Sequence, residues 1–198
     1  MPKNTVTDAQ HVVYTDHSIP RQARSETARV DGVIRLARFG AGNSDDRELG
    51  LGYAILAQRE PSAAYRDRAF EFLEAARRKQ QADAEVLLYL ADLHNQRSQR
   101  EEAVKLYEEA IRLDPSQLTG SVSLGAIRME QGNYTEAIRL WKDALSKNPA
   151  LMLVRGNLAA ALLKTGNRAE AEAVLSRAID FNPEFVPPRW LTDQLSAK

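Results

Sequence analysis

Two of the chain's three histidines, His11 and His17, stand six residues apart in the segment "HVVYTDHSIPR", with Asp16 beside the second. Imidazole and carboxylate groups commonly bind zinc or iron, so this segment is a candidate metal site. In an extended chain the two rings lie ~20 Å apart at ~3.3 Å per residue, and on a helix they face away from each other. The spacing therefore argues against one shared ion, although two separate sites, one for each histidine, stay open.

The remaining residues offer little for catalysis. The sequence contains no cysteine, which excludes a disulfide, a thiolate metal site, a thiol nucleophile and a covalent haem attachment within it. His94 falls in a helical pattern among Leu90, Leu93 and Arg97, so we expect it to pack between helices rather than to activate a nucleophile. The glycines of "GAGN" at 40–43 lack the Lys-Ser/Thr of a phosphate loop. We expect neither an enzyme nor a cofactor bound by this chain alone.

Charge and hydropathy exclude two classes of partner. The 27 Lys and Arg residues balance the 27 Asp and Glu residues, so no strong field attracts nucleic acid. No apolar stretch approaches the ~20 residues that a membrane-spanning helix requires, and "MPKNTVTDAQ" lacks the apolar core of a signal peptide. We expect no nucleic-acid partner, no membrane insertion and, if the sequence is complete, a cytoplasmic protein.

An internal repeat dominates the rest of the sequence. Pro115, Pro149 and Pro183 follow one another at intervals of 34 residues. The same period divides the sequence into four units: 50–83, 84–117, 118–151 and 152–185. The eighth, twentieth and twenty-seventh positions of every unit hold Ala or Gly, and position twenty-four holds a large residue. Small side chains let two antiparallel helices approach closely, so each unit is predicted to be a helix pair.

Local signals mark where these helices begin and end. Asn133 and Asn167 stand where an N-cap would begin the second helix of the third and fourth units, and Ser98 has the same place in the second. Ser44 is the expected cap of the first helix. The prolines end each second helix, because proline cannot continue a helix and restricts the residue before it. The first unit has Gln81 where the others have proline, so its boundaries are expected to differ.

This 34-residue pattern resembles the tetratricopeptide repeat (TPR), whose signature has small residues at these positions and a proline near the end. The resemblance implies an all-α fold: an α-solenoid of four TPR helix-turn-helix repeats. Residues 1–43 are expected to form an N-terminal arm, mostly extended or irregular, and 44–185 the repeats. Residues 186–198 are expected to form a C-terminal capping helix, with Trp190, Leu191 and Leu195 facing inward.

In TPR proteins the first helix of each unit lines a concave face that binds a peptide or a partner's helix. The resemblance implies that the partner-binding residues are Glu85, Leu88, Tyr89, Asp92, Asn95, Gln96, Thr119, Ser123, Ala126, Met129, Asn157, Ala160 and Lys164. Position five holds Leu88, Val122 and Gly156 instead of the Lys with which chaperone-binding members hold a C-terminal carboxylate, so that clamp is absent. The alternative is that these residues are merely the exposed face of a short solenoid.

The N-terminal arm has a second resemblance. Met1, Pro2, Lys3, His11, Thr15, Asp16 and His17 match a segment found in certain bacterial cytochromes. This segment resembles the one after the last haem motif in bacterial multihaem c-type cytochromes fused to TPR repeats. It implies that His11 and His17 are axial ligands to haem bound by residues outside this chain. The sequence would then be part of a larger, exported protein, and its location would be periplasmic.

The sequence thus leads to two hypotheses of different class. The first is a non-enzymatic protein–protein interaction scaffold that binds a protein or peptide on the concave TPR face. The alternative is the C-terminal docking module of a larger multihaem c-type cytochrome, with the N-terminal histidines near haem. Neither the identity of the partner nor the oligomeric state follows from the residues.

Overall fold

The computed structural model describes residues 29–30, 33–34, 36 and 45–196, and the following account is confined to them. His11 and His17 lie outside the described residues. The chain divides into two compact units, 1–35 and 36–198. In the first, β1 (Arg29–Val30) pairs with β2 (Val33–Ile34) in antiparallel orientation.

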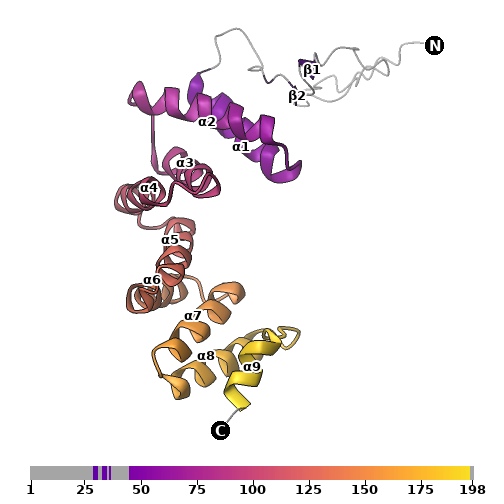
Figure 1. Ribbon diagram of the computed structural model, residues 1–198, viewed down its shortest axis with the longest axis vertical. Helices are drawn as coiled ribbons and strands as arrows, with labels where there is room; N and C mark the ends of the chain where they lie inside the picture. The colour runs from indigo at the N-terminus through magenta and orange to yellow at the C-terminus, as the bar shows by residue number, and fades with distance from the viewer. Residues whose placement is uncertain (1–28, 31–32, 35, 37–44, 197–198) are drawn as a thin grey trace, which may run out of the picture. The chain divides into compact units, whose positions relative to one another are not determined.

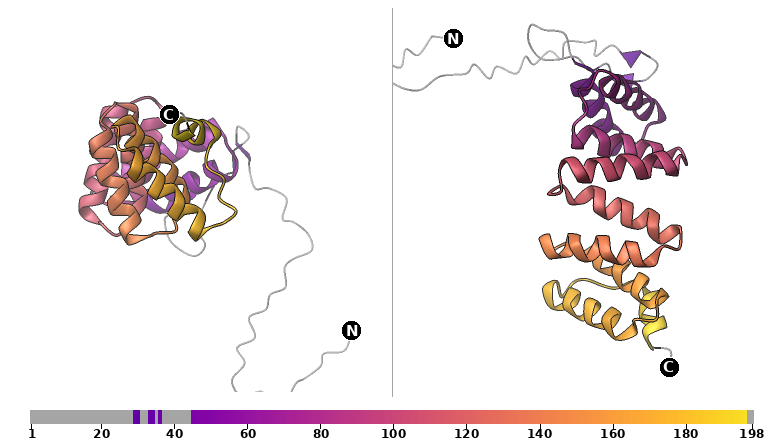
Figure 2. Two further views of the ribbon diagram at one scale, coloured as in Figure 1. Left: turned by 90° about the horizontal axis from the view of Figure 1, so that it is seen from below. Right: turned by 90° about the vertical axis from the view of Figure 1, so that its left-hand side faces the viewer.

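The second unit is built from helix pairs. Its described residues form α1 (Asp46–Arg59), α2 (Ala63–Arg78), α3 (Ala84–Gln96), α4 (Arg100–Leu113), α5 (Leu118–Glu130), α6 (Tyr134–Lys147), α7 (Met152–Lys164), α8 (Arg168–Phe181) and α9 (Arg189–Ser196). Each odd-numbered helix from α1 to α7 packs against the next helix, and the pairs stack through α2 on α3, α4 on α5 and α6 on α7 (Figures 1 and 2). The expected all-α solenoid of four pairs followed by a C-terminal helix is confirmed. The residue limits assigned to the arm, the repeats and the cap stay predictions.

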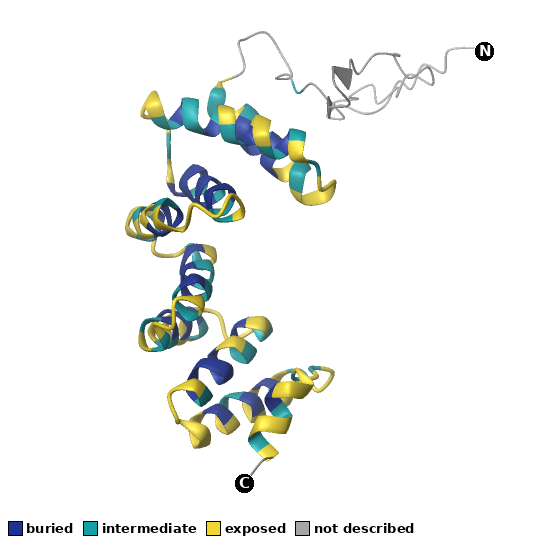
Figure 3. Cartoon of the chain, in the orientation of Figure 1, coloured by how far each residue is buried: buried dark blue, intermediate teal, exposed yellow. Residues whose placement is uncertain are grey.

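The small residues lie where the helices meet. The alanines at position twenty, Ala69, Ala103, Ala137 and Ala171, are fully buried, and Figure 3 shows buried residues along the faces between helices. At Gly125 an added Cβ would lie 2.4 Å from the Trp141 Nε1 atom. The large side chain at position twenty-four thus occupies the space that the small residue leaves open.

The first pair departs from the frame of the others. The N-cap of α1 is Asp45, whose carboxylate accepts a hydrogen bond from the Glu48 N–H at 2.7 Å, so the prediction of Ser44 as cap was wrong. Because Pro61 restricts the residue before it, Glu60 is extended (φ −127°) and α1 ends early. The helix is therefore displaced toward the N-terminus relative to the 34-residue frame.

This displacement changes which small residue meets the second helix. An added Cβ on Gly50 would lie 2.6 Å from the Leu73 Cγ atom, so Gly50 takes the place that Gly125 has in the third pair. Ala57, at the eighth position of the first unit, is only half-buried. Eleven of the twelve expected small positions are buried, and Ala57 is the exception.

The turns inside the pairs confirm one cap prediction and correct another. Asn133 accepts the backbone N–H of the residue three positions on, at 3.3 Å, as a capping side chain should. Asn167 also stands at an N-cap but makes no capping hydrogen bond. Ser98 was wrongly predicted as a cap: the N-cap of α4 is Gln99, and Ser98 is the left-handed residue before it (φ 62°).

The second helices end by two different means. The residues before Pro115, Pro149 and Pro183 are extended (φ −140°, −136° and −139°), so α4, α6 and α8 end there. No proline follows α2, and Gln80 instead adopts a left-handed conformation (φ 58°). The Gln81 N–H then donates to a carbonyl five residues back at 2.9 Å, which closes the helix end.

The C-terminal helix α9 buries one side. Leu191 is 0% exposed and belongs to the core cluster of the last pair, and Leu195 packs against that cluster. Trp190 is 50% exposed, so the prediction that it faces inward was wrong. Successive residues of a helix point about 100° apart, and a short helix on a surface cannot bury both.

Candidate functional site

Two neighbouring pockets lie along the first helices of the N-terminal pairs. A pocket of about 240 Å³ between α1, α3 and α5 is lined by Gln58, Glu85, Leu88, Tyr89, Asp92, Gln117 and Thr119. A second, of about 140 Å³, shares Gln58, Tyr89 and Asp92 with the first and adds Gln96. Six of the thirteen residues expected to bind a partner thus line these two spaces. We call them together the Tyr89 pockets.

Asp92 is the polar centre of the Tyr89 pockets. Its half-buried carboxylate accepts a hydrogen bond from the hydroxyl of Tyr107, a buried side chain of α4. Burial raises the pKa of Asp92 above its ordinary value, and the hydrogen bond from Tyr107 only partly opposes this. Burial and then the charge of Asp92 raise the pKa of Tyr107, while a hydrogen bond with Ser123 of α5 lowers it. These contacts connect the three helices behind the pocket wall.

An ion-pair group fixes the other wall. The Arg47 Nη2 atom of α1 lies 2.5 Å from the Asp83 carboxylate and 3.1 Å from the Glu85 carboxylate. Asp83 is also the N-cap of α3, and accepts the Val86 N–H at 3.0 Å. Burial raises the pKa of Asp83, but the hydrogen bonds from Val86 and Arg47 outweigh it and lower that pKa overall. Arg47 therefore holds α1 against the start of α3.

Tyr89 presents an aromatic ring to both spaces. Its half-buried side chain stands on α3 between Glu85 and Asp92 in sequence. Burial raises the pKa of Tyr89, and the charges of Glu85 and Asp92 raise it further. The phenol is therefore neutral near neutral pH and offers both an apolar face and a hydroxyl group.

Four further predicted residues lie on α3 and α5 and do not line these pockets: Asn95, Ser123, Ala126 and Met129. Asn95 is half-buried on α3. Ala126 and Met129 of α5 are half-buried and pack against the core cluster that includes α7. Part of the surface of Ala126 and Met129 is therefore used for packing between the third and fourth pairs.

The predicted residues on α7 do not come together as those on α3 do. Asn157 and Lys164 are exposed. Ala160 is only 5% exposed and belongs to the same core cluster as Leu191 of α9. Ala160 therefore presents almost no surface to a partner.

Gln58, Gln117 and Arg47 are among the residues on or beside the pockets that the sequence analysis did not assign to partner binding. Gln58 stands at position nine of the first unit, which is the position that Asp92 has in the second. The TPR resemblance, applied to the first unit as well, would have identified it. Gln117 is the last residue of its unit, and no motif marks it. Arg47 precedes the first unit, and only the folded chain brings it to Glu85.

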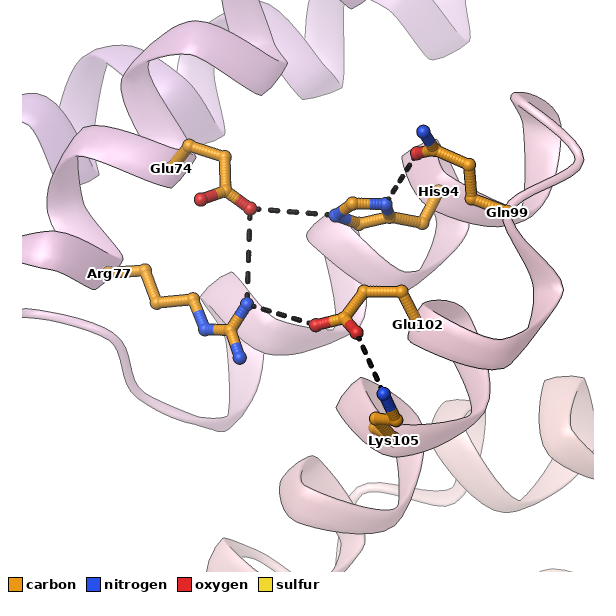
Figure 4. A network of polar contacts seen from close by, with 6 residues as sticks. All are labelled: Glu74, Arg77, His94, Gln99, Glu102 and Lys105. Atoms are coloured by element: carbon orange, nitrogen blue, oxygen red, sulfur yellow. Dashed lines mark hydrogen bonds and ion pairs between the residues drawn. The ribbon is translucent and has the colours of Figure 1, made fainter.

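His94 serves packing, as expected. It is 8% exposed, and its Nδ1 atom lies 2.7 Å from the Gln99 Oε1 atom and its Nε2 atom 3.5 Å from the Glu74 carboxylate (Figure 4). The edge of its ring meets Phe70 of α2, with the centroids 5.1 Å apart. Within the part of the chain that the structure describes, no three His, Asp or Glu side chains gather as a metal site. No helix in that part is both long and apolar enough to cross a membrane.

Comparison with known proteins supports the repeat assignment. Two family models described as tetratricopeptide repeat match residues 66–117 and 128–192. A tetratricopeptide repeat protein from Parabacteroides merdae ATCC 43184 has a similar structure, with TM-score 0.65, 20% identity and coverage of 76% of this chain and 58% of that chain. MamA from Desulfovibrio magneticus RS-1 is also similar, with TM-score 0.61, 18% identity and coverage of 72% and 78%.

These structural similarities establish the fold alone. At 20% and 18% identity, the function of those proteins does not transfer to this chain. No match was found among curated proteins. The matches described above include no cytochrome, and they indicate no catalytic family.

Proposed function

This chain carries tetratricopeptide repeats, and we propose that it is a non-enzymatic protein–protein interaction scaffold that binds an extended partner segment on the faces of α1, α3 and α5. The observation that carries the proposal is the pair of Tyr89 pockets. Six of the residues that the TPR resemblance assigns to partner binding line them. TPR proteins are generally scaffolds, and the low-identity fold matches are consistent with that role.

The lining of the pockets suits a peptide rather than a small molecule. At about 240 Å³, the larger pocket is below the ~300–1,000 Å³ typical of small-molecule sites, and it fits a single side chain. Gln58, Gln117 and Thr119 offer amide and hydroxyl groups to the backbone of an extended segment. Leu88 and Tyr89 offer apolar surface for its side chains.

Affinity purification with matched tyrosine variants tests this proposal. Tyr89→Ala removes an aromatic side chain that lines both pockets, whereas Tyr134→Ala removes a tyrosine that is also half-buried but stands on α6. A partner recovered with the wild type and with Tyr134→Ala should be lost with Tyr89→Ala, because a buried aromatic anchor contributes about 2 kcal/mol or more, roughly 30-fold in affinity. Thermal unfolding of both variants confirms that each is folded. Recovery of the same partner with Tyr89→Ala would reject the proposed surface.

The alternative hypothesis, that the chain is the docking module of a multihaem cytochrome, rests on the N-terminal sequence alone. It requires Cys-x-x-Cys-His motifs in the reading frame before Met1, with His11 and His17 as axial ligands to haem held there. Translation of the DNA upstream of Met1 tests it directly. A stop codon in that frame immediately upstream would eliminate this alternative.

A further inference from the structure

We propose that the Tyr89 pockets select a basic side chain, Lys or Arg, of the partner segment, and that Asp92 is the specificity-determining residue. This inference rests on the proposed function and specifies the chemistry of its partner. It is carried by the charges that line the pockets, by the aromatic ring beside them and by an equivalent arrangement elsewhere in the chain.

The acidic groups around the larger pocket outnumber the basic ones. Arg47 is shared between the carboxylates of Asp83 and Glu85, so one cation faces two anions and this group keeps a net negative charge. Asp92 adds a second negative charge on the same helix, one turn from Tyr89. A cationic side chain is therefore complementary to the larger pocket, and an anionic one is repelled.

The carboxylate of Asp92 is held by a hydroxyl group. Within residues 45–196, the partner found for its carboxylate is the Tyr107 hydroxyl, and no ion pair involves it. Arg66 lines the smaller pocket but makes no ion pair with Asp92 among the described residues. Burial without a cation disfavours the charged carboxylate, and this is why the pKa of Asp92 is raised. A bound Lys or Arg would supply the missing charge-assisted hydrogen bond.

The ring of Tyr89 adds a second attraction for a cation. A guanidinium or ammonium group that reaches Asp92 from either pocket also meets Tyr89, which lines both. Cations are attracted to the faces of aromatic rings, most strongly where water is partly excluded. A carboxylate and an aromatic ring on one wall thus favour a basic side chain over a neutral amide of similar length.

The chain already uses this arrangement internally. The Arg97 guanidinium carbon lies 3.7 Å from the centre of the Phe70 ring, and its Nη2 atom lies 2.7 Å from the Asp67 carboxylate. An aromatic ring and a carboxylate on α2 therefore hold Arg97, the C-cap of α3. Tyr89 and Asp92 offer the same two groups, and no described cation pairs with Asp92.

Selection from a library of randomised heptapeptides displayed on phage tests this inference. Wild-type protein, Asp92→Asn and Asp180→Asn serve as immobilised targets. Asp92→Asn removes the charge but keeps an oxygen that can accept from Tyr107, and Asp180→Asn makes the same change at an exposed position of α8. Peptides that wild type and Asp180→Asn enrich should share Lys or Arg at one position, and Asp92→Asn should lose this preference.

A synthetic peptide taken from the selection then allows the contribution of its basic residue to the binding affinity to be measured. Its affinity, measured by calorimetry, should fall at least tenfold when its basic residue is replaced by Gln, and by a similar factor for Asp92→Asn. The two changes together should cost no more than either alone, because both remove one interaction. Thermal unfolding of Asp92→Asn shows whether this variant is folded. Glu85→Gln is a second variant that removes a negative charge from the same pocket.

The outcomes separate the two proposals. Enriched peptides that bind through Tyr89 but carry no preferred basic residue would overturn this inference and leave the scaffold proposal standing. Equal preference for basic residues with wild type and Asp92→Asn would overturn the role of Asp92. Failure to enrich any peptide whose binding depends on Tyr89 would count against the proposed function itself.

Discussion

The second and fourth helix pairs place different side chains at the same two positions. Position nine of the unit, on its first helix, is Asp92 in the second pair and Ala160 in the fourth. Position twenty-four, on its second helix, is Tyr107 in the second pair and Leu175 in the fourth. In the second pair the two side chains are joined by a hydrogen bond, and the carboxylate faces the Tyr89 pockets. In the fourth pair both are buried in a cluster that includes Leu191 of α9.

The difference shows that one backbone frame accommodates either a polar or an apolar pair of side chains at these two positions. Where the pair of residues is polar, the first helix keeps a solvated face with pockets beside it. Where the pair is apolar, both residues join the core cluster to which Leu191 of α9 contributes, as expected where the end of a solenoid requires a cap. The predictions below test whether the fourth pair is specialised for stability and the second for polar recognition.

The largest effect is expected from the cap. Leu191→Ala removes a fully buried side chain and leaves a cavity between α9 and the fourth pair. The free energy of unfolding should fall by about 2–5 kcal/mol. Urea titration followed by circular dichroism measures this loss. Trp190→Ala is the matched control, since its larger side chain is half exposed on the same helix, and an equal loss in that control would refute the specialised role of Leu191.

A smaller effect is expected behind the pocket of the second pair. Tyr107→Phe keeps the buried ring but removes the hydroxyl that donates to Asp92. A half-buried carboxylate without its donor should cost about 1–3 kcal/mol of unfolding free energy. Tyr134→Phe makes the same chemical change on α6, where no carboxylate among the described residues accepts from the hydroxyl, and should change stability by less than about 0.5 kcal/mol. Indistinguishable urea midpoints for the two variants would contradict the polar role of this pair.

The turns inside the two pairs allow a reciprocal test. Ser98 in the second pair and Gly166 in the fourth are both left-handed, with φ 62° and 78°. Because a side chain disfavours this conformation, Ser98→Gly should stabilise the protein by about 0.5–1 kcal/mol, and Gly166→Ser should destabilise it by a similar amount. Thermal unfolding compares the two variants with the wild type. Changes of the same sign in both would show that backbone conformation does not determine these turn residues.

The smallest effect is expected from titration of Asp92. Because folding raises its pKa, the native state binds more protons than the unfolded chain between the two pKa values. The contribution of Asp92 to stability is therefore greatest below the unfolded pKa of about 4 and falls as the pH rises above it. Urea titrations from about pH 4 to about pH 7 should show the wild type losing stability relative to Asp92→Asn. A difference that stays constant or grows with pH would contradict this.

Much of the fold could be predicted from local patterns. The interval of Pro115, Pro149 and Pro183 and the alanines at fixed positions are consequences of helix packing that every unit must satisfy. The first pair was misplaced because Gly50, and not Ala57, meets Leu73. The displacement of the first pair depends on where Pro61 ends α1. The other units have no proline at that position, so a repeat pattern copied from them does not predict the displacement.

The candidate site was predicted less completely. Glu85, Tyr89 and Asp92 were identified because the resemblance to TPR proteins assigns their positions in the unit to the concave face, and all three line the Tyr89 pockets. The same rule also selected Ala160, which the core of the fourth pair buries. Periodicity gives the direction of a side chain from its helix, but not which other helix covers it.

By itself the sequence determined the number of helix pairs, the small residues between them and the positions at which prolines end helices. Those features depend on neighbours within about one turn or on contacts repeated in every unit, so they can be read from spacing. Only the tertiary structure decided that Asp92 meets Tyr107, that Arg47 reaches Glu85 and that Leu191 covers the last pair. These contacts join residues from different helices, and their distances depend on how whole helices pack.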